Sequence, residues 1–164
     1  MIILMKAKHH FWSSLAAGGA LYWASGSGAA LAGAMLGGFF IDADHVIDHW
    51  LAVRHGAPYT RKTRGPSPSS ESGLRAWAAR YLRRRKLVRL PLIFHSYELL
   101  IALAVLTVMI RAPFLTGLCA GYALHLALDL YRHYHEFRSP FFYLLSYRLA
   151  QGFRRDKLIK PEYL

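Results

Sequence analysis

The sequence has 164 residues, 54% of them apolar, and Lys and Arg (21) outnumber Asp and Glu (9) by twelve. This composition excludes a disordered tail, which lacks apolar residues, and argues against a simple soluble nucleic-acid module, which seldom carries such long apolar runs. The single cysteine, Cys119, excludes an intramolecular disulfide and a cysteine-rich metal site. We therefore expect one domain with an all-α fold, embedded in a membrane.

The first part of the chain predicts a helical hairpin. Residues 11–41 contain no charged side chain, and the only interruption is a patch of small residues at 25–28. Gly and Ser in such a patch favour a tight turn between two apolar helices. We expect transmembrane helices at about residues 9–25 and 28–51. A cleaved signal peptide over residues 6–25 is the alternative interpretation.

A polar and basic segment follows at residues 54–89. It begins with a proline-containing loop, and from residue 74 onward apolar side chains alternate with seven Arg and Lys residues. This composition is typical of a basic amphipathic helix that lies on an anionic membrane surface. We expect a loop and an interfacial helix here, with anionic lipid headgroups as partners.

A second hairpin is predicted after this segment. The apolar stretch of residues 87–130 has one turn signal, at Arg111, Ala112 and Pro113. Proline cannot continue a helix but readily starts one, so we expect transmembrane helices at about residues 90–111 and 113–134. Residues 139–164 are amphiphilic and predict an interfacial C-terminal segment. Whether residues 140–151 enter the bilayer is left open.

The distribution of basic residues predicts the orientation of the chain in the membrane. Of the 21 Lys and Arg residues, 20 lie before the first hairpin, between the hairpins or after the second one, and only Arg111 lies at a turn. Basic residues stay on the cytoplasmic side of a membrane. We expect a multi-pass protein of the inner membrane whose N- and C-termini are cytoplasmic.

Four ionisable residues lie at matching distances from the two expected turns. His10 precedes the first turn by 16 residues and Asp42 follows it by 16, while His95 precedes the second turn by 17 and Asp129 follows it by 17. At about 1.5 Å per residue, all four lie about 25 Å from the turns, near the cytoplasmic boundary. Ionisable groups in a span are costly and usually functional, which predicts a shared site.

His and carboxylate side chains suit Zn²⁺, Mn²⁺ or Fe²⁺ when thiolates are absent. Further candidates share helical faces with the first four residues, since His45 follows Asp42 by three positions and His125 precedes Asp129 by four. The candidates are enough for a two-metal site. His9 is an alternative to His10. We expect the metal ligands to come from seven residues: His10, Asp42, Asp44, His45, His95, His125 and Asp129.

Three further residues are assigned to chemistry around the metal. Glu98, three residues after His95, and Asp48 are candidate catalytic groups that accept the proton of an attacking water. Arg132, one turn after Asp129, is a candidate for binding substrate phosphate.

These motifs together resemble the membrane-bound metal-dependent hydrolases of the YdjM-like group, which are similar by motif to zinc-dependent phospholipase C. The resemblance covers residues 9–140. It rests on residues 41–45, on His95-Ser96, and on a full match of a Gly-Tyr-x-x-His-x-x-x-Asp element at Gly121, Tyr122, His125 and Asp129. One departure is Leu90, which takes the place of a family His. The resemblance implies metal ligation by these elements and hydrolase activity.

The sequence therefore favours a hydrolase that cleaves a phosphoester or a phospholipid-type anionic substrate through metal-activated water. The alternative is a non-enzymatic metal-binding membrane protein whose basic loop docks anionic lipid, a protein partner or nucleic acid. Nucleic acid is the less favoured partner, and the oligomeric state is open. A transporter ranks third, because residues 15–38 and 99–120 offer no ionisable pair apart from Arg111 and Cys119.

Overall fold

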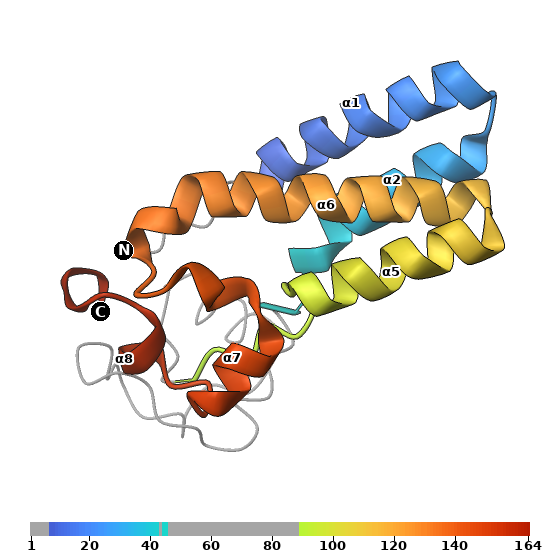
Figure 1. Cartoon of the computed structure of the whole chain (residues 1–164). Coiled ribbons are helices and arrows are strands. Elements are labelled where there is room, and N and C mark those ends of the chain that lie inside the picture. The colour runs from blue at the N-terminus through green and yellow to red at the C-terminus, as the bar shows by residue number, and fades with distance from the viewer. Residues whose placement is uncertain (1–6, 43, 46–88) are drawn as a thin grey trace, which may run out of the picture.

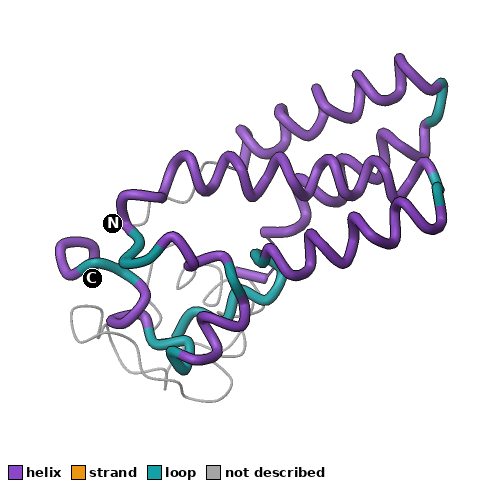
Figure 2. The backbone as a smooth tube through the Cα atoms, in the orientation of Figure 1, coloured by secondary structure: helices purple, strands orange, loops and turns teal. Residues whose placement is uncertain are grey.

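The computed structural model describes residues 7–42, 44–45 and 89–164. Within these residues the chain consists of helices joined by loops and turns, and it contains no strand (Figure 2). The predicted all-α fold is confirmed. The expected loop and amphipathic helix lie outside the described residues except for Arg89, and so does the candidate catalytic residue Asp48.

Four longer helices form a bundle of two hairpins. The first hairpin contains α1 (Ala7–Ser25) and α2 (Gly28–Phe39), and the second contains α5 (Tyr97–Ile110) and α6 (Pro113–His133). Helix α6 packs against the other three helices. Both hairpin turns lie at the same end of the bundle, at the right of Figure 1, and the C-terminal segment lies at the other end.

Local sequence explains both turns. Gly26 adopts a positive φ of 67° between α1 and α2, a conformation that glycine reaches without steric cost. Arg111 ends α5 with a φ of 54°, and its backbone N–H donates to the carbonyl oxygen of Thr107 at 2.9 Å. Pro113 then starts α6, where its missing N–H costs nothing.

Small residues let α2 and α6 pack with their backbones in contact. Gly33 and Gly37 of α2 face α6, and Gly117 and Gly121 of α6 face α2 in return. A Cβ atom added to Gly37 would lie 2.2 Å from the carbonyl oxygen of Leu118. Glycines four residues apart on each helix produce this kind of close approach, which is common between helices in membranes.

Short helical segments make up the remaining described chain. The 3₁₀ turn η1 (Phe40–Asp42) follows α2 directly. After α6 the chain packs back against the bundle end, where Phe137 and Phe142 stack with ring centroids 3.8 Å apart and Leu158 and Ile159 are buried. These C-terminal elements are η4 (Tyr134–Glu136), η5 (Pro140–Tyr143), α7 (Leu145–Ala150), α8 (Arg155–Leu158) and η6 (Pro161–Tyr163).

Two helix boundaries differ from those expected. The helix expected at residues 90–111 begins only at Tyr97, because Ser96 caps it by accepting from the Leu99 N–H at 3.3 Å. Pro91 disfavours helical backbone before it, and Leu92 has a positive φ of 44°. The helix expected at residues 28–51 is interrupted after Phe39 by η1. A non-helical loop therefore carries His95.

One helical segment in the described part of the chain, Pro113–Glu136, is long and apolar enough to cross a membrane. The apolar helices Gly28–Phe39 and Tyr97–Ile110 are shorter. At about 1.5 Å per residue, the 14 residues of α5 extend about 21 Å, less than a hydrocarbon layer of about 30 Å. The four predicted transmembrane helices stay a prediction.

Candidate metal centre

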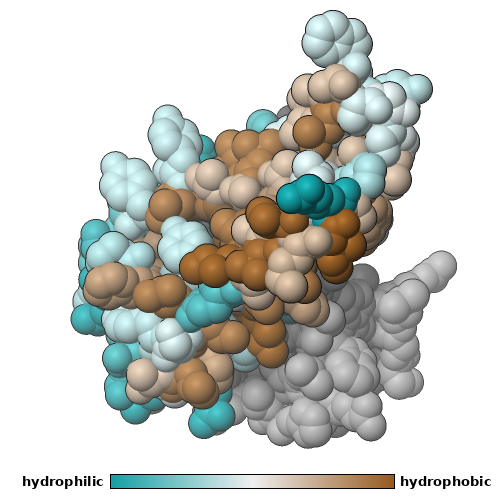
Figure 3. Space-filling model, turned by 45° about the vertical axis from the view of Figure 1, so that its right-hand side comes forward, coloured by the Kyte–Doolittle hydropathy of each residue, from teal (hydrophilic) through white to brown (hydrophobic). Residues whose placement is uncertain are grey.

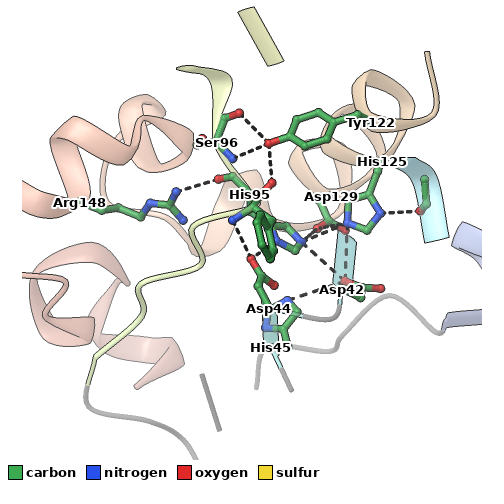
Figure 4. Close-up of polar contacts among 11 residues, drawn as sticks. Asp42, Asp44, His45, His95, Ser96, Tyr122, His125, Asp129 and Arg148 are labelled. Carbon is green, nitrogen blue, oxygen red and sulfur yellow. Dashed lines mark hydrogen bonds and ion pairs between the residues drawn. The ribbon is translucent and has the colours of Figure 1, made fainter. Parts of the chain in front are cut away.

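Histidine and aspartate side chains from four segments converge in one cluster, most of which Figure 4 shows. His10 comes from α1, Asp42 from η1, His95 from the loop before α5, and His125 and Asp129 from α6. All of them are buried except Asp42, which is partly exposed. The residues at matching sequence distances from the two turns therefore lie close together in the structure.

The two central imidazoles lie within a few ångströms of each other and of two carboxylates. The Nε2 atoms of His95 and His125 are 3.1 Å apart, and each lies 3.4 Å from Oδ2 of Asp129 and 3.6 Å from Oδ1 of Asp42. Ligands at about 2.0–2.1 Å from a tetrahedral zinc ion are about 3.3 Å apart. The distances from each imidazole to the other imidazole and to the two carboxylates are close to this value, so these side chains could act as ligands of a metal ion.

Outer hydrogen bonds orient both central imidazoles. Nδ1 of His95 lies 2.8 Å from Oδ2 of Asp44, and Nδ1 of His125 lies 2.7 Å from the carbonyl oxygen of Gly38. Because both oxygens are acceptors, each Nδ1 carries a hydrogen and donates it. The lone pair of a neutral ring then lies on Nε2, the atom that faces the centre, as in metal-binding histidines.

Two further histidines flank this set. Nε2 of His10 lies 3.3 Å from Oδ1 of Asp129, and its ring stacks on His125 with centroids 4.0 Å apart. On the other side, Nε2 of His45 lies 3.8 Å from Oδ1 of Asp42. The buried group of His10, Asp42, His125 and Asp129 could hold a metal ion, and Asp42, His45 and His95 form a second, overlapping group.

Tyr122 holds the loop that carries His95. Its hydroxyl lies within hydrogen-bond distance of the carbonyl oxygens of Phe94 and Ser96, and it accepts from the Ser96 N–H at 3.3 Å. The Phe94 carbonyl oxygen and the Ser96 N–H precede the helix, which begins only at Tyr97, so a side chain of α6 satisfies them, while the Ser96 carbonyl oxygen also accepts from the Leu100 N–H. The position of His95 therefore depends on α6 as well as on its own loop.

Three predicted site residues have different surroundings from those expected. Oδ2 of Asp44 contacts the outer nitrogen of His95 and accepts from the Phe94 N–H, so this oxygen orients a candidate ligand. Glu98 accepts from the backbone N–H groups of Leu145 and Ser146 and from the Ser146 hydroxyl, and thereby caps α7. Arg132 is exposed on α6.

Sequence reasoning did not assign a role to the Tyr122 hydroxyl, the Gly38 carbonyl or Arg148. The Gly-Tyr pair before His125 was a signal for Tyr122. Gly38 contributes its backbone carbonyl oxygen, and the sequence pattern does not indicate which carbonyl oxygen orients His125. Arg148 donates to the carbonyl oxygen of His95 across 53 residues of sequence, so no local spacing could have indicated it.

The electrostatics of the centre depend on pairing between carboxylates and imidazoles. Burial alone would lower the pKa of His95, but hydrogen bonds to Asp129, Asp42 and Asp44 outweigh it and raise this pKa well above its usual value. Burial would likewise raise the pKa of Asp42, and the hydrogen bond from His95 with the charges of neighbouring imidazoles lowers it instead. The carboxylates therefore favour the protonated form of His95 when no cation is bound.

Metal binding is expected to weaken as the pH falls. Ligation requires a neutral His95, so Zn²⁺ affinity should rise with pH until the raised pKa of His95 is passed. The stability of the metal-free protein has the opposite dependence: the contribution of His95 is complete below the ordinary pKa of about 6.5 and is lost as the pH rises through the raised value. Calorimetric titration with Zn²⁺ and thermal unfolding over a pH series test both trends, and a pH-independent affinity would contradict this assignment.

His9 and His10 provide a matched pair of variants. His10 is buried against Asp129 and His125, whereas its neighbour His9 is exposed. His10→Ala is expected to lower Zn²⁺ affinity by about 10-fold or more, and His9→Ala is expected to leave it unchanged. Equal affinities of the two variants would remove His10 from the centre.

Comparisons of the chain with protein-family models, curated proteins and solved structures find no match. The resemblance to membrane-bound metal-dependent hydrolases therefore stays a prediction. The metal centre is assigned from the geometry of its own residues.

Proposed function

We propose that the protein is a membrane-bound metal-dependent hydrolase that acts at the cytoplasmic membrane interface on a phosphoester or a phospholipid-type anionic substrate. The observation that supports this proposal most strongly is the convergence of imidazole and carboxylate groups, in which Nε2 of both His95 and His125 lies 3.4–3.6 Å from carboxylate oxygens of Asp42 and Asp129. The outer hydrogen bonds to both imidazoles support it as well, because metal-binding histidines usually donate their second ring N–H to a carboxylate or a backbone carbonyl oxygen.

Zinc is the metal that this donor set fits best. Imidazole nitrogens together with carboxylate oxygens are typical ligands of Zn²⁺, whereas Mg²⁺ and Ca²⁺ prefer oxygen ligands in larger shells. Mn²⁺ and Fe²⁺ are the alternatives. Oδ1 of Asp129 faces His10 while Oδ2 faces His95 and His125, so this carboxylate could also bridge to a second ion.

A divalent ion held here would lower the pKa of water and polarise a phosphoryl oxygen. The chain itself supplies the geometry: His95 and His125 are fixed from behind, and Asp129 is buried between them and His10. Asp42 and His45 are the partly exposed members, with side-chain exposures of 27% and 25%, so substrate approaches from their side. His45 is a candidate proton acceptor on this side.

The surface of the bundle supports a membrane location. Large apolar side chains are exposed along α5, among them Ile101, Val108 and Met109, and Trp12 and Trp23 of α1 are exposed as well. In Figure 3 hydrophobic side chains cover much of the visible surface of the described chain. Contiguous apolar surface of this kind marks an interaction with lipid or protein, and tryptophans are enriched at membrane interfaces. With the distribution of basic residues, this favours an inner-membrane protein whose metal centre faces the cytoplasm.

Turnover by the protein purified from the membrane fraction tests the proposal. A panel of phosphodiesters and anionic phospholipids should contain a substrate, and Asp44→Asn should lower its turnover by about 10- to 100-fold, because the variant loses the charge that orients His95. Asp156→Asn is the matched control, since Asp156 pairs with Arg154 on the surface. An inactive wild-type protein across phosphate, acyl and amide substrates would contradict the hydrolase assignment.

One observation favours a non-enzymatic metal-binding protein as the second candidate. One candidate group offers four protein ligands, His10, Asp42, His125 and Asp129, and closed four-ligand sites are typical of structural zinc, whereas catalytic sites keep a position open. In that case the basic segment would dock anionic lipid, a protein partner or nucleic acid. Stoichiometric metal without turnover of any substrate would favour this candidate.

A further inference from the structure

Arg148 of α7 lies beside the metal centre, although the proposed chemistry does not use it. Its side chain has no exposed surface, and Nη2 donates to the backbone carbonyl oxygen of His95 at 2.8 Å (Figure 4). Burial lowers the pKa of this guanidinium, and the negative charges of Asp44 and Glu98 act in the opposite direction. A buried cation is thus attached to the backbone of a metal ligand.

The burial of Arg148 is poorly compensated. Its Nε and Nη1 atoms have no hydrogen-bond partner in the described part of the chain, and its guanidinium carbon lies 5.7 Å from the centroid of the Phe142 ring. Buried charges with incomplete partners cost stability, and an apolar side chain of similar volume is often as stable or more so. Arg148 is therefore poorly explained as a stabilising residue of the fold.

Helix α7 is fixed in a position from which Arg148 reaches His95. At its N-terminus, Glu98 accepts from the N–H groups of Leu145 and Ser146 at 2.8 and 2.9 Å. Beyond its C-terminus, the carbonyl oxygen of Phe153 accepts from the Leu90 N–H at 2.8 Å. Two hydrogen bonds from α7 and the residues after it therefore hold the loop of residues 89–96, one at Leu90 and one at His95.

We propose that Arg148 is a positioning residue that acts through His95, with its hydrogen bond keeping the loop where Nε2 of His95 reaches the metal centre. This inference rests on the proposed metal centre. Two effects oppose each other when Arg148 is removed: the loss of a positive charge favours a bound cation, and the release of the loop disfavours it. Asp44 and Glu98 already offset the charge, so the positional effect is expected to dominate.

The test compares Zn²⁺ binding and the thermal stability of the metal-free protein in Arg148→Met. We expect Zn²⁺ affinity to fall by about 10-fold or more, with an unchanged or higher melting temperature of the metal-free protein. Arg148→Lys, which retains the charge and one donor, should recover part of the affinity. Arg138→Met is the matched control, because Arg138 also donates to a carbonyl oxygen, that of Ile159, at 2.8 Å.

The outcomes separate this inference from the proposed function. A wild-type protein that does not bind Zn²⁺ contradicts the metal centre itself. If the wild type binds Zn²⁺, equal or tighter binding by Arg148→Met overturns the positioning role, since loss of a positive charge alone produces that result. A variant that fails to fold also overturns it, because Arg148 would then serve the fold rather than the ligand.

Discussion

His125→Ala is expected to abolish stoichiometric metal binding and to lower any hydrolytic turnover by on the order of 10²-fold or more. The Nε2 atom of His125 lies 3.1–3.6 Å from the candidate ligand atoms of His95, Asp129 and Asp42, so its removal takes one ligand from the centre. The same change removes the ring on which His10 stacks. The variant therefore loses both a ligand atom and the ring contact with His10.

Elemental analysis of the purified variant, with circular dichroism to verify its helix content, measures this effect. His135→Ala is the matched control: His135 lies on the following 3₁₀ turn and is exposed, so its loss should leave the metal content unchanged. A folded His125→Ala protein that retains wild-type metal content would contradict the ligand assignment, whatever its activity.

Gly37→Ala is expected to destabilise the bundle by about 3 kcal/mol or more, at the upper end of the usual cost of overpacking. The added Cβ would lie 2.2 Å from the carbonyl oxygen of Leu118, which is backbone and cannot rotate away. The two helices must therefore separate. Because Gly38 is the next residue and its carbonyl oxygen accepts from His125, the separation should also weaken metal binding.

Thermal unfolding in detergent measures the change in stability. Gly19→Ala in α1 is the control substitution, since no atom lies within 4 Å of the added Cβ, and alanine is the better helix former. We expect this variant to be as stable as the wild type or slightly more stable. Equal melting temperatures for the Gly37 and Gly19 variants would show that α2 and α6 do not pack as described.

The parts of the fold that depend on local chemistry were predictable from the sequence. Gly26 and Pro113 indicated the two turns, and apolar composition indicated helices on either side of each turn. Counting residues from the turns placed His10 and Asp129 at one level, and the structure brings these two side chains to 3.3 Å. A regular helical rise makes such counting reliable.

The orientation of individual side chains was not predictable in the same way. Spacing put Asp44 among the ligands, but a carboxylate that binds the far nitrogen of His95 has the same sequence signature as one that binds metal. Glu98 follows His95 by three residues and was expected on the same helical face. The helix begins between the two positions, so that relation does not hold, and the carboxylate caps α7.

The hydrogen bond from His125 to Gly38 makes one structural element serve two purposes. The carbonyl oxygen that orients the imidazole belongs to the helix whose glycines set its distance from α6. With the proposed membrane location, metal affinity should therefore report on the lateral pressure of the surrounding lipid. A bilayer or detergent that slightly widens the spacing between α2 and α6 would loosen the centre before any helix unfolds.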